Sequence, residues 1–184
     1  MKKVLVPLAP GFEEIEAITV IDILRRAGVE VIVAGTQPGP IEASRNTRHL
    51  PDCTLDDVRA ENFDMIVLPG GQPGTTNLHR DPRIRRIISI LQAGNCHLAA
   101  ICAAPTVLAA CGCLKDRAAT SHPTVRDEVA AAAGRISNDR VVADGPVITS
   151  QAAGTAMEFA FALVTILCGA EKAAEVNRGV LARL

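Results

Sequence analysis

The 184-residue sequence has no tryptophan, no tyrosine and only four phenylalanines. Proteins that bind single-stranded nucleic acid stack bases on aromatic side chains, and such side chains are almost absent here. Lysines and arginines number 19 against 20 aspartates and glutamates, so no excess of positive charge attracts nucleic acid or anionic lipid. The composition therefore gives no signal for a nucleic-acid partner.

Long apolar runs are also missing from the sequence. The longest, residues 159–168, has about half the length that a membrane-spanning helix needs. The apolar run near the start, residues 4–9, is short, contains Pro7 and leads into acidic residues, unlike a signal peptide. We expect no membrane segment and a cytoplasmic location.

Motifs for metals and nucleotides are absent as well. None of the six cysteines forms a C-x-x-C pair, and Cys111-Gly112-Cys113 is too closely spaced for a zinc knuckle. The glycine-rich segment 69–74 lacks the G-x-G-x-x-G pattern, and no G-K-[ST] follows it. We expect reduced intracellular thiols, no metal and no cofactor.

Apolar runs typical of strands alternate with helical patterns along the whole chain. This alternation predicts an α/β fold, with a mostly parallel sheet covered by helices on both faces. The length and the 48% hydrophobic content fit one domain over residues 1–184. The expected strands are 3–8, 30–34, 63–68, 98–101, 141–143 and 147–149, the last two forming an edge hairpin, and the expected helices are 14–27, 82–93, 103–111, 124–133 and 154–167.

Cys102 stands where the strand 98–101 passes directly into a helix. This is the layout of a nucleophile elbow, a sharp turn that lifts a reactive side chain off the end of a strand. The small residues Ala100 and Ala104 flank it at the positions where glycine is usual. A nearby helix N-terminus favours thiolate over thiol. The alternative is an inert cysteine buried on a core strand.

Three loops meet at the carboxyl ends of the predicted parallel strands, where ligands bind in such sheets. They are the loop after the first strand, the glycine loop with Gly70 and Gly71, and the turn that carries Cys102. The backbone N–H groups of Gly71 and Ala103 are candidates for an oxyanion hole. The alternative role for the two glycines is a tight turn that needs positive φ.

Glu16 and His122 are the candidate acid/base residues. Glu16 lies in the first turn of the first helix, on the face that carries Val20 and Ile23, so its carboxyl points toward the protein. Burial raises the pKa of a carboxyl, which can then hold and transfer a proton. The alternative is an exposed acid that stabilises the helix start. His122 follows a short strand and faces the same edge, although a lone histidine is more often structural.

Several segments, taken in order, resemble the ThiJ/PfpI superfamily, the class I glutamine amidotransferase-like domains. The nearest match is the parkinsonism-associated protein deglycase branch with its bacterial YajL-like proteins. The resemblance covers essentially the whole chain. It is carried by Gly11-Phe12-Glu13-Glu14-Ile15-Glu16-Ala17, Val67-Leu68-Pro69-Gly70-Gly71, Ala99-Ala100-Ile101-Cys102-Ala103-Ala104-Pro105 and Thr149-Ser150 through Gly154-Thr155.

The resemblance implies a flavodoxin-like three-layer sandwich that forms a homodimer and needs no cofactor. It also implies stress-defence activities: conversion of methylglyoxal or glyoxal to lactate or glycolate, repair of their early adducts on amino acids, proteins and nucleotides, redox sensing and chaperoning. The positions that match the family's site are Cys102 as reactive cysteine, Glu16 as protonated glutamate, His122 as site histidine, Gly70 and Gly71 as glycine loop, and Ser44 with Arg45 as an anion site near the dimer interface.

Two departures from the family pattern bear on function. The protease-like branch has a histidine directly after the nucleophile, and Ala103 in that position argues against a peptidase. Residues 152–154 are Ala-Ala-Gly where the deglycase has Gly-Pro-Gly, so one wall of the pocket differs. Two main hypotheses remain: a cysteine-dependent hydrolase or lyase acting on 2-oxoaldehydes, and a redox sensor or chaperone that uses oxidation of Cys102.

Overall fold

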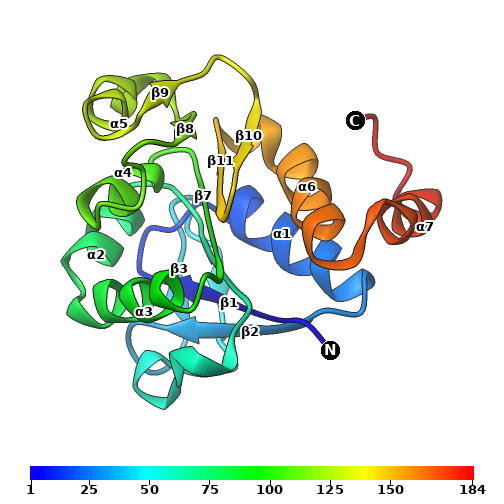
Figure 1. Cartoon of the computed structure of the whole chain (residues 1–184). Helices are drawn as coiled ribbons and strands as arrows, with labels where there is room; N and C mark the ends of the chain where they lie inside the picture. The colour runs from blue at the N-terminus through cyan, green and yellow to red at the C-terminus, as the bar shows by residue number, and fades with distance from the viewer.

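The computed structural model describes all residues, Met1–Leu184. A seven-stranded sheet forms its centre, with strand order β10-β11-β7-β6-β1-β2-β5 (Figure 1). Every neighbouring pair is parallel except β10 with β11, which form the expected hairpin at one edge. These strands are β1 (Lys3–Leu8), β2 (Glu30–Gly35), β5 (Cys53–Thr54), β6 (Met65–Leu68), β7 (His97–Ile101), β10 (Val141–Asp144) and β11 (Val147–Ser150).

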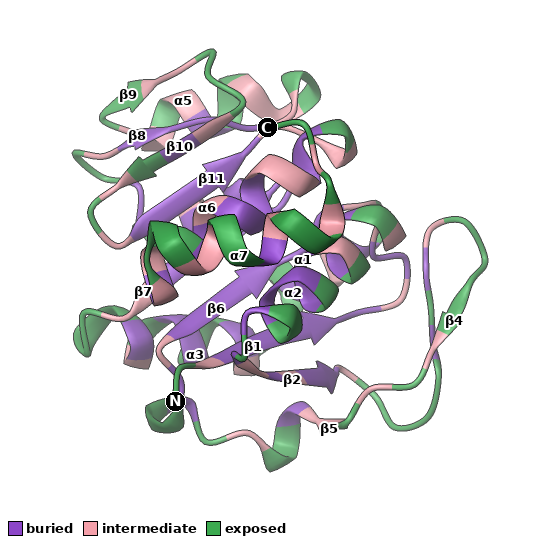
Figure 2. Cartoon of the chain, turned by 90° about the vertical axis from the view of Figure 1, so that its right-hand side faces the viewer, coloured by how far each residue is buried: buried purple, intermediate pink, exposed green.

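Helices cover both faces of the sheet, as predicted (Figure 1). On one face lie α1 (Glu14–Arg26), α6 (Ala156–Cys168) and, outside them, α7 (Ala170–Val180); together with the strands they enclose a core of 28 buried residues. The other face carries α2 (Gly74–Arg80), α3 (Pro82–Ala93), α4 (Pro105–Ala110) and α5 (Arg126–Ala132) over a core of 23 residues. The central strands β1, β6, β7 and β11 are largely buried, and the outer helix surfaces are exposed (Figure 2).

Two short strand pairs extend the fold beyond the central sheet. The antiparallel pair β3 (Ile41–Glu42) and β4 (Arg48–His49) follows β2, and the parallel pair β8 (Ala118–Ala119) and β9 (Arg135–Ile136) brackets α5. The loop after β1 and the β3–β4 pair are tied together, because the N–H of Gly11 donates to the carbonyl of Glu42 at 2.8 Å. This pair therefore stands beside the carboxyl end of the sheet.

Residue preferences explain the main boundaries. The carboxylate of Glu13 caps α1 by accepting from the N–H of Glu16 at 2.9 Å, and Gly28 with φ +80° ends the helical run. Asp81 caps α3 in the same way, with Pro82 at its first position. The six predicted strands are present, and the five predicted helices are present with ends that agree within two residues.

Two helices were missing from the sequence-based expectation. Helix α2 has only seven residues and the polar sequence GTTNLHR, and α7 has a single fully buried residue, Val176. A helix that buries so little apolar surface shows only a weak periodic pattern. The last predicted helix also differs, because residues 153–155 form a single 3₁₀ turn before α6 begins.

Candidate active site

Cys102 occupies the sharp turn between β7 and α4 that the sequence predicts. It has φ +65°, a left-handed conformation that a residue with a side chain rarely adopts. Two backbone hydrogen bonds hold the turn: the N–H of Cys102 donates to the carbonyl of Ser150 at 3.0 Å, and its carbonyl accepts from the N–H of His122 at 2.8 Å. The Cys102 side chain is half-buried in this turn and is not enclosed on the core strand itself.

Glu16 lies in the protein interior with only 1% of its surface exposed. Its Oε2 accepts from the N–H of Gly70 at 2.8 Å, whereas Oε1 is buried with no hydrogen-bond partner. Burial raises the pKa of Glu16 to about 7, while the neighbouring Cys102 thiol and the N–H of Gly70 act in the opposite direction. The predicted buried carboxyl with a raised pKa is confirmed.

The glycine loop allows this close approach between Glu16 and Cys102. A Cβ atom on Gly70 would lie 2.6 Å from Glu16 Oε2 and 2.7 Å from Cys102 Cβ, so no larger residue fits. Gly71 has φ +87°, which glycine adopts without strain. The tight-turn role of the glycines is therefore real. It is compatible with the other role, because the same turn directs the Gly71 N–H to the sulfur.

The protonation of Cys102 differs from the expectation of a resting thiolate. Burial and the neighbouring Glu16 raise the pKa of the Cys102 thiol to about 12. The N–H groups of Gly71 and Ala103 lower it, but by less. The helix contributes little because α4 begins only at Pro105 and has six residues. The correction has two physical causes: a thiolate is costly away from water, and a second negative charge beside Glu16 adds to that cost.

The titrations of Glu16 and Cys102 are therefore coupled. A carboxylate next to a thiol and a carboxylic acid next to a thiolate carry the same net charge, and proton transfer between the two groups interconverts them. In such a pair the apparent pKa values belong to the pair and not to either residue alone. Glu16 can thus take the thiol proton at the moment when the sulfur attacks a substrate.

His122 borders the turn through its backbone. Its ring Nδ1 lies 2.8 Å from Thr124 Oγ1 and also accepts from the Thr124 N–H at 3.3 Å. These contacts fix the ring at the start of the 3₁₀ turn Pro123–Val125. The structure thus places His122 next to Cys102 along the fold, with its Nδ1 committed to Thr124.

Ser44 and Arg45 surround Glu14 instead of Cys102. The Ser44 hydroxyl and the Arg45 N–H donate to the Glu14 carboxylate at 3.0 and 2.7 Å, and Thr47 adds a third bond at 3.0 Å. These hydrogen bonds lower the pKa of Glu14 against the effect of its burial. The anion that this loop holds is therefore a carboxylate of the chain itself.

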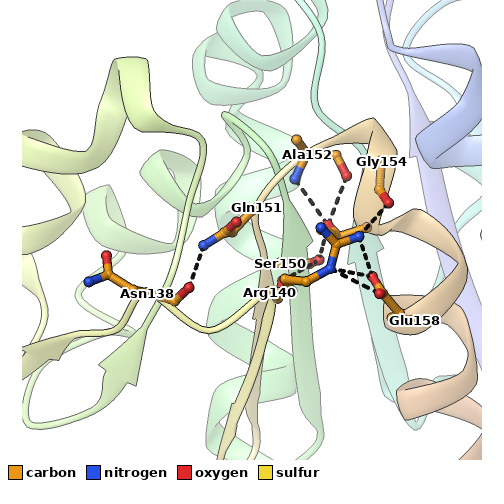
Figure 3. A network of polar contacts seen from close by, with 8 residues as sticks. Asn138, Arg140, Ser150, Gln151, Ala152, Gly154 and Glu158 are labelled. Carbon is orange, nitrogen blue, oxygen red and sulfur yellow. Dashed lines mark hydrogen bonds and ion pairs between the residues drawn. The ribbon is translucent and has the colours of Figure 1, made fainter. Parts of the chain in front are cut away.

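The segment after β11 is braced by a polar network that the sequence did not reveal (Figure 3). The Arg140 guanidinium binds both carboxylate oxygens of Glu158 at 2.9–3.0 Å and donates to the carbonyl of Gly154 at 2.7 Å. The Arg140 carbonyl accepts from the Ser150 hydroxyl at 3.0 Å. Because Ser150 also holds the N–H of Cys102, the network fixes the backbone behind the reactive turn.

A hollow on the surface lies beside this site. It has a volume of about 690 Å³ and runs along α1, between the β3–β4 pair and α7. Ile15 and Ile18 line it with 55% and 37% of their surfaces exposed. Glu14 also lines the hollow, which therefore reaches the helix turn that carries Glu16.

No three histidine, cysteine, aspartate or glutamate side chains are grouped in a way that could hold a metal ion. None of the helices is both long enough and apolar enough to cross a membrane.

A strained cysteine paired with a buried glutamate across a glycine loop matches a known protein family. The model of the DJ-1/PfpI family matches residues 2–166. This chain belongs to the DJ-1/PfpI family. The resemblance to the ThiJ/PfpI superfamily and to its DJ-1-like branch is thereby confirmed, as is the α/β fold with helices on both sides of a mostly parallel sheet.

Similar proteins cover nearly the whole of this DJ-1/PfpI chain. Drosophila melanogaster protein dj-1beta is 41% identical over 181 residues, which are 98% of this chain and 97% of the relative. Its crystal structure has a TM-score of 0.95 and covers 100% of this chain and 99% of the other. A Caenorhabditis elegans protein named glutathione-independent glyoxalase DJR-1.2 is 40% identical, covering 93% of this chain and 91% of the relative.

Proposed function

We propose that this chain is a cofactor-free glyoxalase that converts methylglyoxal to lactate, with Cys102 as nucleophile and Glu16 as acid/base. One observation carries the proposal: the buried Glu16 carboxyl and the Cys102 side chain meet at Gly70, where a Cβ atom would lie 2.6 Å from Glu16 Oε2 and 2.7 Å from Cys102 Cβ. A nucleophile, a proton carrier and the N–H groups of Gly71 and Ala103 as oxyanion donors are the parts that carbonyl addition requires.

In the first step the sulfur attacks the aldehyde carbon of methylglyoxal. The thiol proton passes to Glu16, the new C–S bond forms, and the electron pair of the C=O bond moves to the oxygen. The N–H groups of Gly71 and Ala103 stabilise this oxyanion. Protonation of the oxygen gives a hemithioacetal, and Glu16 is a carboxylate again.

In the second step Glu16 takes the proton from the former aldehyde carbon, and an enediol forms across the two carbons. Glu16 then returns the proton to the neighbouring carbon, which leaves a lactoyl thioester on Cys102. Water adds to the thioester carbonyl and the C–S bond breaks, releasing lactate and the thiol. Methylglyoxal and one water thus become lactic acid, with no external oxidant or reductant. His122 borders the turn and is the candidate that assists the water.

The same machinery extends to early adducts of 2-oxoaldehydes on thiols and amines. A hemithioacetal or a carbinolamine releases the free aldehyde when its carbon–sulfur or carbon–nitrogen bond breaks. Cys102 can then capture the aldehyde, so glycated amino acids and proteins belong to the proposed substrate class. The glyoxalase name of the C. elegans relative supports the free aldehyde as the first substrate to test.

The decisive experiment follows methylglyoxal loss and lactate formation without glutathione, comparing the wild type with Cys102→Ala. Turnover should fall on the order of 10³-fold or more when the nucleophile is removed. Cys168→Ala is the matched control, because Cys168 is also half-buried but ends α6, away from the turn. Unchanged turnover in Cys102→Ala, or no turnover in the wild type, rejects the proposal.

Redox sensing by Cys102 is the second candidate function. The half-buried sulfur is open to small oxidants, and the N–H groups and protonated Glu16 that surround it can also hold sulfinate oxygens. A Toxoplasma gondii DJ-1, 33% identical with a TM-score of 0.95, has been solved as the oxidised protein. Peroxide should add about 32 Da at Cys102, corresponding to a sulfinate. Oxidation spread evenly over the six cysteines argues against a sensor.

We also propose a homodimer closed over the hollow along α1. Exposed Ile15 and Ile18 lie there beside groups of both charges, including Asp22 and Arg26, as a surface that pairs with its own copy requires. Ile15→Asp should shift the sedimentation coefficient from dimer to monomer. Leu50→Asp, at a position that is 76% exposed and lies outside the hollow, should leave it unchanged. A wild type that sediments as a monomer overturns the dimer.

A further inference from the structure

The C-terminal end of α4 carries two further cysteines that the proposed function does not use. Helix α4 ends at Ala110, and Cys111, Gly112 and Cys113 form the turn that follows. The N–H of Cys113 donates to the carbonyl of Leu108 at 3.0 Å, and that of Gly112 to Ala109 at 2.9 Å. This is a Schellman motif, with Gly112 in the left-handed position at φ +72°.

The Schellman motif explains two of the three residues. Its geometry requires a glycine at 112 and favours a buried apolar residue at 113, where Cys113 is only 5% exposed. The motif makes no demand for a sulfur at 111. The Cys111 side chain is half-buried and Gly112 is exposed with nothing near its Cβ position, so this turn is open to solvent on one side.

The sequence spacing of the two cysteines is compatible with a disulfide. Residues two apart have Cα atoms at most about 7 Å from each other, and a disulfide spans about 4.4–6.8 Å. The Cys113 sulfur lies 3.8 Å from the carbonyl oxygen of Cys111 and 3.5 Å from Gln92 Oε1. Gly112 gives the intervening backbone the freedom to adjust.

The electrostatics distinguish the two thiols. Burial raises the pKa of Cys111, and the charge of Arg85, which is exposed on α3 and forms no ion pair, counteracts part of this effect. Burial raises the pKa of Cys113 to about 12. No third ligand completes a metal site around the pair. Cys111 is less buried than Cys113 and is therefore the thiol that an external reagent meets first.

We propose that Cys111 and Cys113 form a redox dithiol that becomes an intrachain disulfide by exchange with an anionic low-molecular-weight disulfide. The Cys111 thiolate attacks one sulfur of the reagent, a mixed disulfide forms, and the first thiolate leaves. Cys113 then gives up its proton and attacks the Cys111 sulfur, and the second thiolate leaves. The external disulfide gains two electrons and the two protons, and the protein dithiol loses them.

Glutathione disulfide is the probe for the test, and mass spectrometry of the full chain and its fragments is the readout. The wild type should lose two hydrogens between residues 111 and 113, about 2 Da, with no lasting adduct at Cys111. In Cys113→Ser the mixed disulfide cannot resolve, so a glutathione adduct should remain at Cys111 with at least about tenfold higher occupancy. Cys111→Ser should leave the buried Cys113 unmodified.

The outcomes separate this proposal from the chemistry of Cys102. Equal adduct occupancy at Cys111 in the wild type and in Cys113→Ser overturns the dithiol, and so do two intact thiols in the oxidised wild type. The disulfide in the wild type is measured without any variant, which keeps the test valid if Cys113→Ser folds poorly. Oxidation of Cys102 adds oxygen mass at a different position, and failure of the aldehyde assay has no bearing on this result.

Discussion

Helix α4 has a sulfur-bearing turn at each end, and the two turns differ in how they use positive φ. At the N-terminal end Cys102 itself takes the left-handed conformation, and Gly70, Glu16 and Ser150 crowd around it. At the C-terminal end Gly112 takes it, and no atom lies within 4 Å of its Cβ position. Backbone strain that dense packing maintains is typical of a functional site. A glycine adopts the left-handed conformation without strain, so the backbone between Cys111 and Cys113 can adjust.

The polar partners of the two turns differ as well. Cys102 faces a carboxyl that can exchange a proton with it, whereas Cys113 faces the amide oxygen of Gln92, which cannot. The first partner enables acid/base chemistry at one sulfur. The second leaves only exchange between two sulfurs. The following predictions test this contrast, beginning with the largest effect.

Replacing the partner of Cys102 should lower methylglyoxal turnover, and replacing the partner of Cys113 should not. Glu16→Gln keeps a hydrogen-bond donor near the sulfur but removes the proton carrier, so methylglyoxal turnover should fall by about 10²–10⁴-fold. Gln92→Leu changes the corresponding partner of Cys113. It should leave turnover within about twofold of the wild type, since Gln92 is exposed at the end of α3 and its side chain contacts Cys113. Steady-state lactate formation measures both. If Glu16→Gln turns over at the wild-type rate, the acid/base role is wrong.

The buried carboxyl should also make stability depend on pH. Glu16 titrates at about 7 in the folded chain and near 4.5 in the unfolded chain. Between these values the unfolded chain has lost its proton and the folded chain keeps it, so the free energy of unfolding falls as pH rises, by about 3 kcal/mol in total. Urea denaturation at several pH values measures the slope. Glu16→Gln should flatten it, and an equal slope in both proteins contradicts the assignment.

Adding a methyl group to each glycine turn should separate packing from backbone strain. Gly70→Ala places a Cβ 2.6 Å from Glu16 Oε2, and such overpacking costs about 1–3 kcal/mol and displaces the catalytic pair. Gly112→Ala meets no neighbour and costs only the left-handed strain, about 1–2 kcal/mol. Thermal unfolding and turnover together distinguish them: Gly70→Ala should lose activity and Gly112→Ala should keep it. Loss of activity in both would mean that α4 couples the two turns.

The turn at Cys102 was predictable because its signals are local. An apolar strand of five residues, a cysteine and a helix start lie next to one another in sequence. The burial of Glu16 was predictable too, because helix periodicity places it on the apolar face of α1. Parallel topology then brings the loops after β1, β6 and β7 to one edge of the sheet, so the meeting of Glu16, Gly70 and Cys102 follows from pattern alone.

The protonation of Cys102 and the Arg140 network were not predictable in this way. The direction of the Cys102 pKa depends on how close the Glu16 charge lies and how far water is excluded, and neither is encoded in local spacing. Arg140 and Glu158 are 18 residues apart, in a turn and a helix that only tertiary packing brings together. Ser44 and Arg45 show the same limit, since their partner Glu14 lies some 30 residues earlier in the chain.

The smallest expected effect concerns the brace behind the Cys102 turn, which has no counterpart at the other end of α4. Arg140 binds Glu158 and the Gly154 carbonyl, but the guanidinium is 57% exposed, so water screens the ion pair. Arg140→Ala frees residues 151–154 and should change KM for methylglyoxal by less than about fivefold, with kcat nearly constant.

Arg140→Lys keeps the charge but loses the forked contact, so it should restore only part of the change. Lys172→Ala breaks an exposed ion pair on α7 and is the control. An equal KM shift in the control, or a fall in kcat alone, would show that the brace does not set the position of the pocket wall.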